Sequence, residues 1–214
     1  SLVNFLPFDY NNDGKLDIAG INQGTTDFDA NFNFIYVDMN LSFFTGGDNG
    51  LSEINPQYIN FFPWDLDRGD VTGDGIDDLA VSNIGDIEQL TSFLGTNASI
   101  NLFENRTDRF SAWKSIPMTG VTYAVLAADF DMDGDVDIIA TVQEIVDVGG
   151  AARLDPYLRV FENDGKGEFT QTASLTLEEE PRYAVKGDFD KDGDLDLAVL
   201  CTIIDTAGSS NAVN

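Results

Sequence analysis

Four acidic nonapeptides repeat along the chain with the pattern Asp-x-(Asp/Asn/Thr)-x-Asp-Gly-x-x-Asp. Their first residues are 61, 59 and 59 residues apart (70−9, 129−70 and 188−129), and the copies span residues 9–17, 70–78, 129–137 and 188–196. Oxygen-bearing side chains at alternate positions, with a glycine that permits a sharp bend, are what a hard cation such as calcium requires. The sequence therefore predicts four metal-binding loops, numbered 1 to 4 along the chain, with up to four calcium ions.

Within each loop, the side chains at positions 1, 3, 5 and 9 and the backbone carbonyl at position 7 can converge on one ion. The predicted ligands are Asp9, Asn11, Asp13, Lys15 and Asp17 in loop 1; Asp70, Thr72, Asp74, Ile76 and Asp78 in loop 2; Asp129, Asp131, Asp133, Asp135 and Asp137 in loop 3; and Asp188, Asp190, Asp192, Asp194 and Asp196 in loop 4. Lys15, Ile76, Asp135 and Asp194 would act through their backbone carbonyls.

The chemistry of this ligand set favours calcium over other metals. A site made of oxygen atoms alone excludes zinc and the soft metals, and the strict octahedral geometry of magnesium fits it less well. Asn11 keeps an oxygen at position 3 but loses a charge. The Thr72 hydroxyl is a weaker ligand, so we expect loop 2 to bind least tightly.

The main alternative is the EF-hand, whose calcium loop begins in the same way. An EF-hand requires a glutamate at position 12 and a helix on each side of the loop. Position 12 here is Gly20, Val81, Ala140 or Val199, and the flanking segments have the composition of strands. A further alternative is a set of Asp-Gly turns without an ion, but so many adjacent carboxylates would repel one another strongly.

The segments around the loops predict an all-β fold. Short apolar runs follow each loop, at residues 17–21, 78–82, 137–141 and 196–200, and extended stretches such as 122–128 and 182–186 precede them. Two further strands are expected at 100–105 and 110–116, and at 158–163 and 169–177. Four-stranded units without helices, repeated near every sixty residues, are typical of the blades of a β-propeller.

The four units cover approximately residues 1–60, 61–119, 120–179 and 180–214 of a single propeller region. We expect residues 34–38 to be the third strand of the first unit, and polar insertions at 84–98 and 144–156. The last unit is expected to stop after two strands, giving about three and a half blades. A propeller closes into a ring. We therefore expect a fragment of a larger ring, such as a seven-bladed one, completed by further blades of the same parent chain or by a second copy.

The composition excludes several classes of function. The chain has 38 acidic and 11 basic residues, a formal net charge of −27, which argues against nucleic-acid binding because phosphates require clustered Lys and Arg. It has no histidine, which excludes Ser-His-Asp and Cys-His catalysis and histidine ligation of metals. No apolar stretch approaches the roughly 18 residues of a membrane-spanning helix.

The sequence around the third and fourth loops resembles a known family. The runs Gly187-Asp-Phe-Asp-Lys-Asp-Gly-Asp-Leu-Asp-Leu-Ala-Val199 and Phe161-Glu-Asn-Asp-Gly-Lys-Gly-Glu-Phe169 are similar to FG-GAP/VCBS repeats, which include the integrin α-subunit propeller and several seven-bladed lectins of fungi and bacteria. The resemblance implies a β-propeller with calcium in the loop between the first two strands of each blade. It also implies a secreted or cell-surface protein. The chain departs from the family in having too few blades.

Because all four loops hold equivalent places in their units, we expect a structural calcium rather than a catalytic one. The function expected first is a non-enzymatic module for adhesion or for recognition of a glycan or protein ligand. Candidate contact residues are the aromatic side chains of the less regular segments, Trp64, Phe93, Trp113 and Tyr157.

The alternative function is a polysaccharide lyase or hydrolase built on a propeller. Two carboxylates can perform acid–base chemistry without histidine, and Tyr123 or Tyr183 with Arg182 can abstract a proton. No acidic pair outside the loops is singled out by its position, and the glutamates at 178–180 are expected to form a solvated turn. A third possibility is an architectural segment of a large surface protein.

Overall fold

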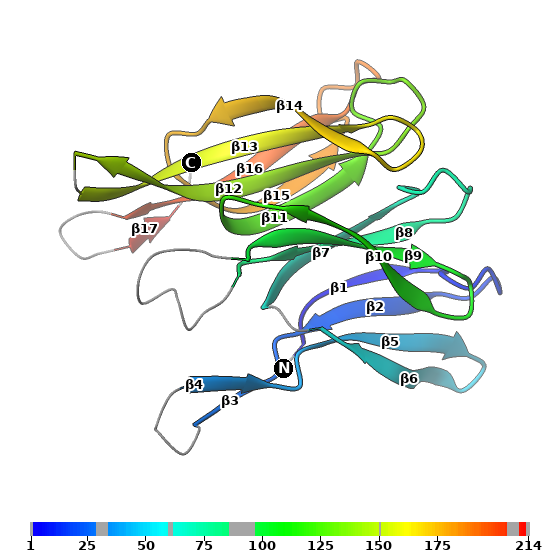
Figure 1. Ribbon diagram of the computed structural model, residues 1–214. Helices are drawn as coiled ribbons and strands as arrows, with labels where there is room; N and C mark the ends of the chain where they lie inside the picture. The colour runs from blue at the N-terminus through cyan, green and yellow to red at the C-terminus, as the bar shows by residue number, and fades with distance from the viewer. Residues whose placement is uncertain are drawn as a thin grey trace.

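The computed structural model describes residues 2–28, 34–59, 62–85, 97–149, 151–204 and 210–212. Within these residues the chain forms antiparallel strands and turns without a helix, as the short alternating apolar segments predict (Figure 1). The strands make four sheets that follow one another along the chain, together with a separate two-stranded hairpin. The predicted all-β fold of propeller-type blades is confirmed, as an open arc of sheets and not a closed ring.

Three of the sheets have four strands, and the fourth has three among the described residues. Sheet 1 contains β1 (Leu2–Phe8), β2 (Asp17–Asn22), β5 (Asn40–Gly47) and β6 (Gly50–Tyr58). Sheet 2 contains β7 (Pro63–Gly69), β8 (Asp78–Asn83), β9 (Ser99–Asn105) and β10 (Phe110–Pro117). Sheet 3 contains β11 (Gly120–Ala128), β12 (Asp137–Val148), β13 (Ala151–Asn163) and β14 (Phe169–Thr176). Sheet 4 contains β15 (Glu180–Gly187), β16 (Asp196–Ile204) and β17 (Ser210–Ala212).

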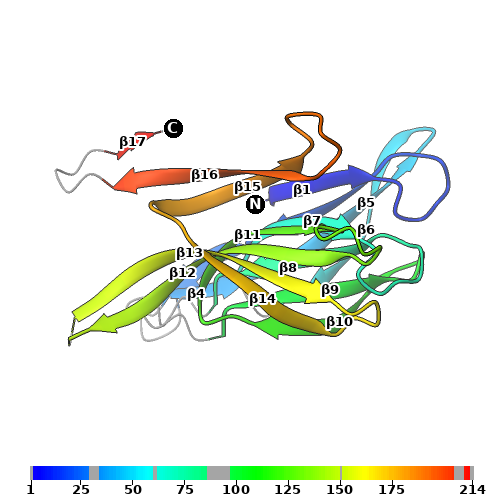
Figure 2. The ribbon, with the colours of Figure 1, turned by 90° about the horizontal axis from the view of Figure 1, so that it is seen from above.

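Each acidic loop connects the first and second strands of its sheet. Position 9 of the loop is the first residue of the second strand, and it pairs with the last residue of the first strand. These pairs are Phe8 with Asp17, Gly69 with Asp78, Ala128 with Asp137 and Gly187 with Asp196. The four loops consequently lie at the same end of the sheets, as Figures 1 and 2 show.

Successive sheets pack face to face, with their first strands side by side: β1 beside β7, β7 beside β11, and β11 beside β15 (Figure 1). Buried aliphatic and aromatic side chains fill the three layers between the sheets. Sheets 2 and 3 are covered on both faces, which is why every residue of β8 and nearly every residue of β11 is buried. The largest fully buried apolar side chains are Ile21, Leu41, Leu79, Ile100, Leu102 and Ile138.

Sheet 4 has one covered face and one exposed face. Ala184 packs against sheet 3, whereas Val185 and Phe189 are 56% and 57% exposed. The positions 59 residues earlier, Leu126 and Phe130, are those with which sheet 3 contacts sheet 4. The exposed face of sheet 4 is therefore equivalent to the face of sheet 3 that packs against sheet 4.

The prediction that residues 34–38 form the third strand of the first unit is wrong. That strand is β5, whose Leu41 pairs with Ile21 and whose Phe44 pairs with Ile18. The earlier segment is β4 (Phe34–Val37), which pairs with β3 (Thr25–Phe28) in the separate hairpin. All residues of β4 are hydrophobic, whereas β5 has three hydrophobic residues, Leu41, Phe43 and Phe44, among polar residues and glycines. Composition therefore favours the hairpin segment over the sheet strand.

Two further expectations about connections also need correction. The insertion at 144–156 does not fall between the second and third strands, because it is part of them: β12 and β13 continue as a ladder from the pair of Glu144 with Asp155 to that of Val148 with Ala151. The last unit does not stop after two strands, because β17 pairs with the end of β16. Of the other predicted insertion, 84–98, residues 86–96 lie outside the described residues.

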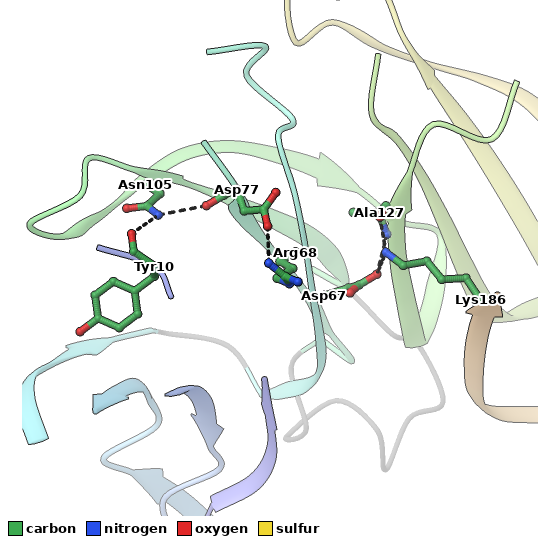
Figure 3. A network of polar contacts seen from close by, with 7 residues as sticks. All are labelled: Tyr10, Asp67, Arg68, Asp77, Asn105, Ala127 and Lys186. Atoms are coloured by element: carbon green, nitrogen blue, oxygen red, sulfur yellow. Dashed lines mark hydrogen bonds and ion pairs between the residues drawn. The ribbon is translucent and has the colours of Figure 1, made fainter. Parts of the chain in front are cut away.

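Charged side chains also join the first strands of neighbouring sheets (Figure 3). Lys186 in β15 donates from Nζ to Asp67 Oδ2 in β7 at 2.6 Å, and to the Ala127 carbonyl in β11. Asp67 Oδ2 also accepts a hydrogen bond from the Ala127 N–H at 2.9 Å. The side chains of Lys186 and Asp67 are 26% and 13% exposed, so this ion pair links three sheets in a largely buried place.

Asp65, two residues earlier in β7, makes a similar link. Its Oδ1 accepts a hydrogen bond from the Asn4 side chain in β1, and its Oδ2 accepts one from the Val125 N–H in β11 at 3.1 Å. The residue is 7% exposed. Burial raises the pKa of Asp65 to about 6; the hydrogen bonds oppose this rise, and the charge of Asp67 adds to it.

We predict that the Asp65→Asn variant becomes more stable, relative to the natural protein, as pH rises. The folded pKa of about 6 lies above the ordinary value of 3.8, so the native state binds the proton more tightly than the unfolded chain. That contribution is complete below the ordinary pKa and is lost as pH passes through the folded pKa, by about 3 kcal/mol in all. Denaturant unfolding of both proteins between about pH 4 and pH 8, at constant calcium, measures the difference. A difference that does not change with pH would contradict this prediction.

Candidate metal sites

The four acidic loops share one backbone conformation. Positions 4 and 6 have positive φ in every loop, a region that glycine adopts readily and most other residues adopt rarely. The φ values at position 4 are +59° (Asn12), +77° (Gly73), +62° (Met132) and +66° (Lys191), and those at position 6 are +83° (Gly14), +89° (Gly75), +100° (Gly134) and +102° (Gly193). The repeated sequence pattern therefore corresponds to a repeated bend.

The carboxylate at position 1 holds each bend in place. In loop 1, Asp9 Oδ1 accepts a hydrogen bond from the Asp13 N–H at 3.0 Å, and its Oδ2 accepts one from the Gly14 N–H at 2.8 Å. Asp70 and Asp129 accept the same two bonds in loops 2 and 3. Such bonds from a side chain to the following backbone stabilise the bend.

Carboxylates at positions 1, 3 and 9 converge in loops 3 and 4. One oxygen from each of Asp129, Asp131 and Asp137 lies within 4.8 Å of the other two. In loops 1 and 2, position 3 is Asn11 or Thr72 and adds no charge. The equivalent group in loop 4 is Asp188, Asp190 and Asp196.

Position 9 connects the loop to the third strand of its sheet. Asp17, Asp78 and Asp137 are almost fully buried. Burial raises the pKa of Asp78 to about 6, and it also raises the pKa of Asp137, to which the charges of Asp131 and Asp133 add. Their Oδ1 atoms accept hydrogen bonds from the N–H groups of Gly46, Asn105 and Asn163, respectively, at 2.7, 2.8 and 3.0 Å.

The donor set of the loops fits a hard divalent cation. Asp17 Oδ2 is buried and has no hydrogen-bond partner. Thr72 Oγ1 is also buried, beside the Asp78 carboxyl, without a hydrogen bond of normal geometry. Both atoms are at predicted ligand positions. Buried oxygens without partners are costly, and a bound cation would supply the coordination and the positive charge that they lack.

Position 5 is arranged differently from positions 1, 3 and 9. Asp133 is not part of the converging group in loop 3, and its Oδ1 accepts a hydrogen bond from the Asp135 N–H at 2.9 Å. The same bond occurs in the other loops, from Lys15 to Asp13, Ile76 to Asp74 and Asp194 to Asp192. This bond orients the peptide before position 7, whose carbonyl is the fifth predicted ligand.

The candidate contact residues are scattered over the arc. Trp64 is partly buried against Tyr123, with ring centroids 5.5 Å apart. The Tyr157 ring lies 5.3 Å from the guanidinium of Arg159. Trp113 packs partly against the core between sheets 2 and 3. Phe93 lies outside the described residues.

One surface groove that sequence reasoning missed contains an exposed aromatic residue. It has a volume of about 360 Å³ and lies between β6 of sheet 1 and the strands β9 and β10 of sheet 2. Tyr58, which is 67% exposed, and Trp113 line it, together with polar side chains such as Gln57 and Asn101. Nothing in the sequence distinguishes Tyr58 from a strand residue of ordinary exposure.

Tyr123, one of the residues considered for catalysis, is buried. The Tyr123 hydroxyl donates to Gln143 Oε1 at 3.2 Å, and Arg182 lies over its ring at 4.8 Å. Burial raises the pKa of Tyr123, the opposite of what a general base requires. Glu180 is not part of a solvated turn, because it begins β15 and pairs with Arg182 at 2.6 Å.

Comparison with known families agrees with this geometry. A model for the FG-GAP-like repeat matches residues 70–140 and 145–199, more than half of the chain, and these ranges include loops 2, 3 and 4. A comparison with curated proteins gives no match. Repeats of this type often bind calcium, and proteins that carry them are commonly extracellular. Among the described residues, no helix is long and apolar enough to span a membrane. The chain belongs to the FG-GAP-like repeat family.

Proposed function

We propose that this chain is a calcium-stabilised propeller module of a secreted or cell-surface protein, which serves adhesion or the recognition of a glycan or protein ligand. The observation that carries the calcium assignment is the recurrence of one bend in four equivalent places. In these loops, oxygens are crowded together or buried without a partner, where they need a positive charge or a hydrogen-bond donor. In the proposed ring, further blades from the same parent chain or a second copy cover the exposed outer faces of sheets 1 and 4.

The role of calcium in this proposal is structural. Asp137 illustrates it, because its Oδ1 binds the end of β13 while its Oδ2 accepts a hydrogen bond from the Phe130 N–H within the loop. A cation bound by Asp129, Asp131 and Asp137 therefore fixes the first, second and third strands of the sheet together. The bond from position 9 to the third strand recurs in sheets 1, 2 and 3. Such repetition is typical of a stabilising element and not of a catalytic centre.

The groove lined by Tyr58 and Trp113 is the proposed contact surface for a glycan. Sugars bind to proteins through aromatic faces combined with a few polar groups that fix their orientation. The groove offers the exposed Tyr58 ring, together with Gln57 and Asn101. The Trp113 ring and the Lys114 ammonium group, by contrast, contact sheet 3. It lies between two sheets, so its shape depends on how firmly those sheets are held.

The alternative is a polysaccharide-active enzyme, and binding and product assays on the same protein separate the two. We expect glycan-array binding that is lost in excess EGTA, with no unsaturated product or new reducing end released from acidic or neutral polysaccharides. Tyr58→Ala should weaken binding at least about tenfold, since a buried aromatic contact contributes about 1–3 kcal/mol. Tyr183→Ala is the matched control, because Tyr183 is 50% exposed in β15, in another sheet. Product formation would favour the enzyme, and equal losses in both variants would contradict the groove assignment.

A further inference from the structure

Asn105, at the end of β9, bridges two metal loops (Figure 3). Its side-chain Nδ2 donates to the Tyr10 carbonyl at 2.9 Å and to the Asp77 carbonyl at 3.0 Å. Tyr10 is position 2 of loop 1, and Asp77 is position 8 of loop 2. The Asn105 Oδ1 accepts a hydrogen bond from the Thr107 N–H at 2.9 Å, and the residue is 1% exposed. The amide is therefore fixed, and both of its protons are used between the loops.

Asn163, at the end of β13, makes the same bridge one sheet further along. Its Nδ2 donates to the Val71 carbonyl at 3.2 Å and to the Val136 carbonyl at 3.1 Å, which are position 2 of loop 2 and position 8 of loop 3. Its Oδ1 accepts a hydrogen bond from the Gly167 N–H at 3.0 Å, and the residue is 6% exposed. The two bridges link loop 1 to loop 2 and loop 2 to loop 3.

The bridged carbonyls lie between ligand positions. Position 2 is flanked by the ligands at positions 1 and 3, and position 8 by those at positions 7 and 9. The asparagine also donates its own N–H to the position-9 carboxylate of the later loop. A cation that orders one loop thus fixes the carbonyl that holds the amide, and the amide holds the next loop.

We propose that Asn105 and Asn163 couple calcium binding in adjacent loops, so that an ion in one loop raises the affinity of the next. This inference rests on the proposed calcium binding. Coupling between sites through a shared, fixed contact is typically 5–150-fold in affinity, and it acts equally in both directions. Asn105 and Asn163 are positioning residues in this proposal, and neither ligates the ion.

Sheet 1 supports the assignment by contrast. Gly46 holds the place of the asparagine there, since its N–H donates to the position-9 carboxylate Asp17. A side chain at Gly46 would clash with the carbonyl oxygen of Leu16, which is position 8 of loop 1. The close approach of this carbonyl leaves no room for a bridging side chain at Gly46. No asparagine in the described part of sheet 4 links loop 3 to loop 4.

The test is a calcium titration read separately at each loop. The amide of the position-6 glycine donates to the position-1 carboxylate in all four loops, so its resonance in a ¹⁵N-glycine-labelled protein reports its own loop. Loop 1 is disabled with Asp9→Asn and Asp13→Asn. We expect this to raise the calcium midpoint at Gly75, in loop 2, at least about fivefold. When Asn105→Ala is also present, the same two substitutions in loop 1 should change the calcium midpoint at Gly75 by less than about twofold.

The second bridge provides the matched control. The Asn163→Ala protein should keep the coupling of loop 1 to loop 2 and lose that of loop 2 to loop 3. If Asn105→Ala does not fold, Asn163→Ala tests the same claim at Gly134 after loop 2 is disabled. An equal shift with and without the asparagine, or no shift in the natural protein, overturns the coupling. If no glycine resonance responds to calcium, the proposed calcium binding itself fails.

Discussion

Removal of calcium with excess EGTA is expected to lower the melting temperature of the protein by at least about 10 °C. A site held at 100 times its dissociation constant contributes about 2.7 kcal/mol, and 1 kcal/mol corresponds to about 2–4 °C for a chain of this size. Loops 3 and 4, each with three converging carboxylates, supply about 5 kcal/mol on this basis. Without the cation the same carboxylates repel one another, which adds to the loss. Differential scanning calorimetry measures the effect.

Controls separate this effect from that of ionic strength. Calcium added in excess should restore the melting temperature, whereas magnesium at the same concentration should not. A variant with Asp188→Asn and Asp190→Asn should lose only the part of the shift that belongs to loop 4. Isothermal titration should give up to four equivalents of calcium, with loop 2 weakest because of Thr72. An identical melting curve with and without EGTA would reject the structural role of calcium.

Lys186→Met is expected to reduce the free energy of unfolding by about 2–3 kcal/mol. The substitution leaves the Asp67 carboxylate, 13% exposed, without its cation, and removal of one partner of a buried ion pair costs several kcal/mol. Because the Lys186 side chain is 26% exposed, we expect a loss of stability at the lower end of the range for buried ion pairs. Because the ammonium group also donates to Ala127 in sheet 3, the loss should loosen sheet 4 first. Denaturant unfolding and amide exchange in β15 and β16 measure both effects.

A double-mutant cycle tests whether the pair itself is responsible. Asp67→Asn keeps an oxygen for the Ala127 N–H, so the double variant should lose less stability than the sum of the single variants, by about 1–2 kcal/mol. Arg109→Met is the matched control, because Arg109 and Asp108 form an exposed pair, which should contribute at most about 1 kcal/mol. Strict additivity of the two substitutions would show that Lys186 stabilises the arc by other contacts.

Much of the fold and the loops follows from the sequence because the information is local. The pattern from Asp129 to Asp137 specifies a bend within nine residues, and the short apolar runs on either side are typical of buried strands. The third strand of the first unit was missed because residues 34–37 are more hydrophobic than residues 40–47, which contain polar residues and glycines. The choice between them depends on which one pairs with β2, and that pairing spans an inserted hairpin.

The contacts between sheets were not predictable in the same way. Asn105 follows Phe-Glu at the end of a predicted strand, as Asn163 does, and this repetition was visible. Its partner Tyr10 is 95 residues away, and nothing in the composition indicates that their loops are adjacent. The pair of Lys186 with Asp67 spans 119 residues. Side chains that act across a repeat boundary become identifiable when the packing of one sheet on the next is known.

The way in which the sheets stack also determines what kind of assembly the arc can enter. Each sheet presents one face to the sheet before it and a different face to the sheet after it. Leu126 lies on the later face of sheet 3, and Val185 lies at the equivalent place on sheet 4. Contacts that continue this arrangement are heterologous, because they join two unlike surfaces. A two-fold dimer formed by pairing the exposed face of sheet 4 with itself would break this polarity. Further sheets can therefore be added at this face in one direction only. Addition ends when the rotation from each sheet to the next brings the last sheet against the first.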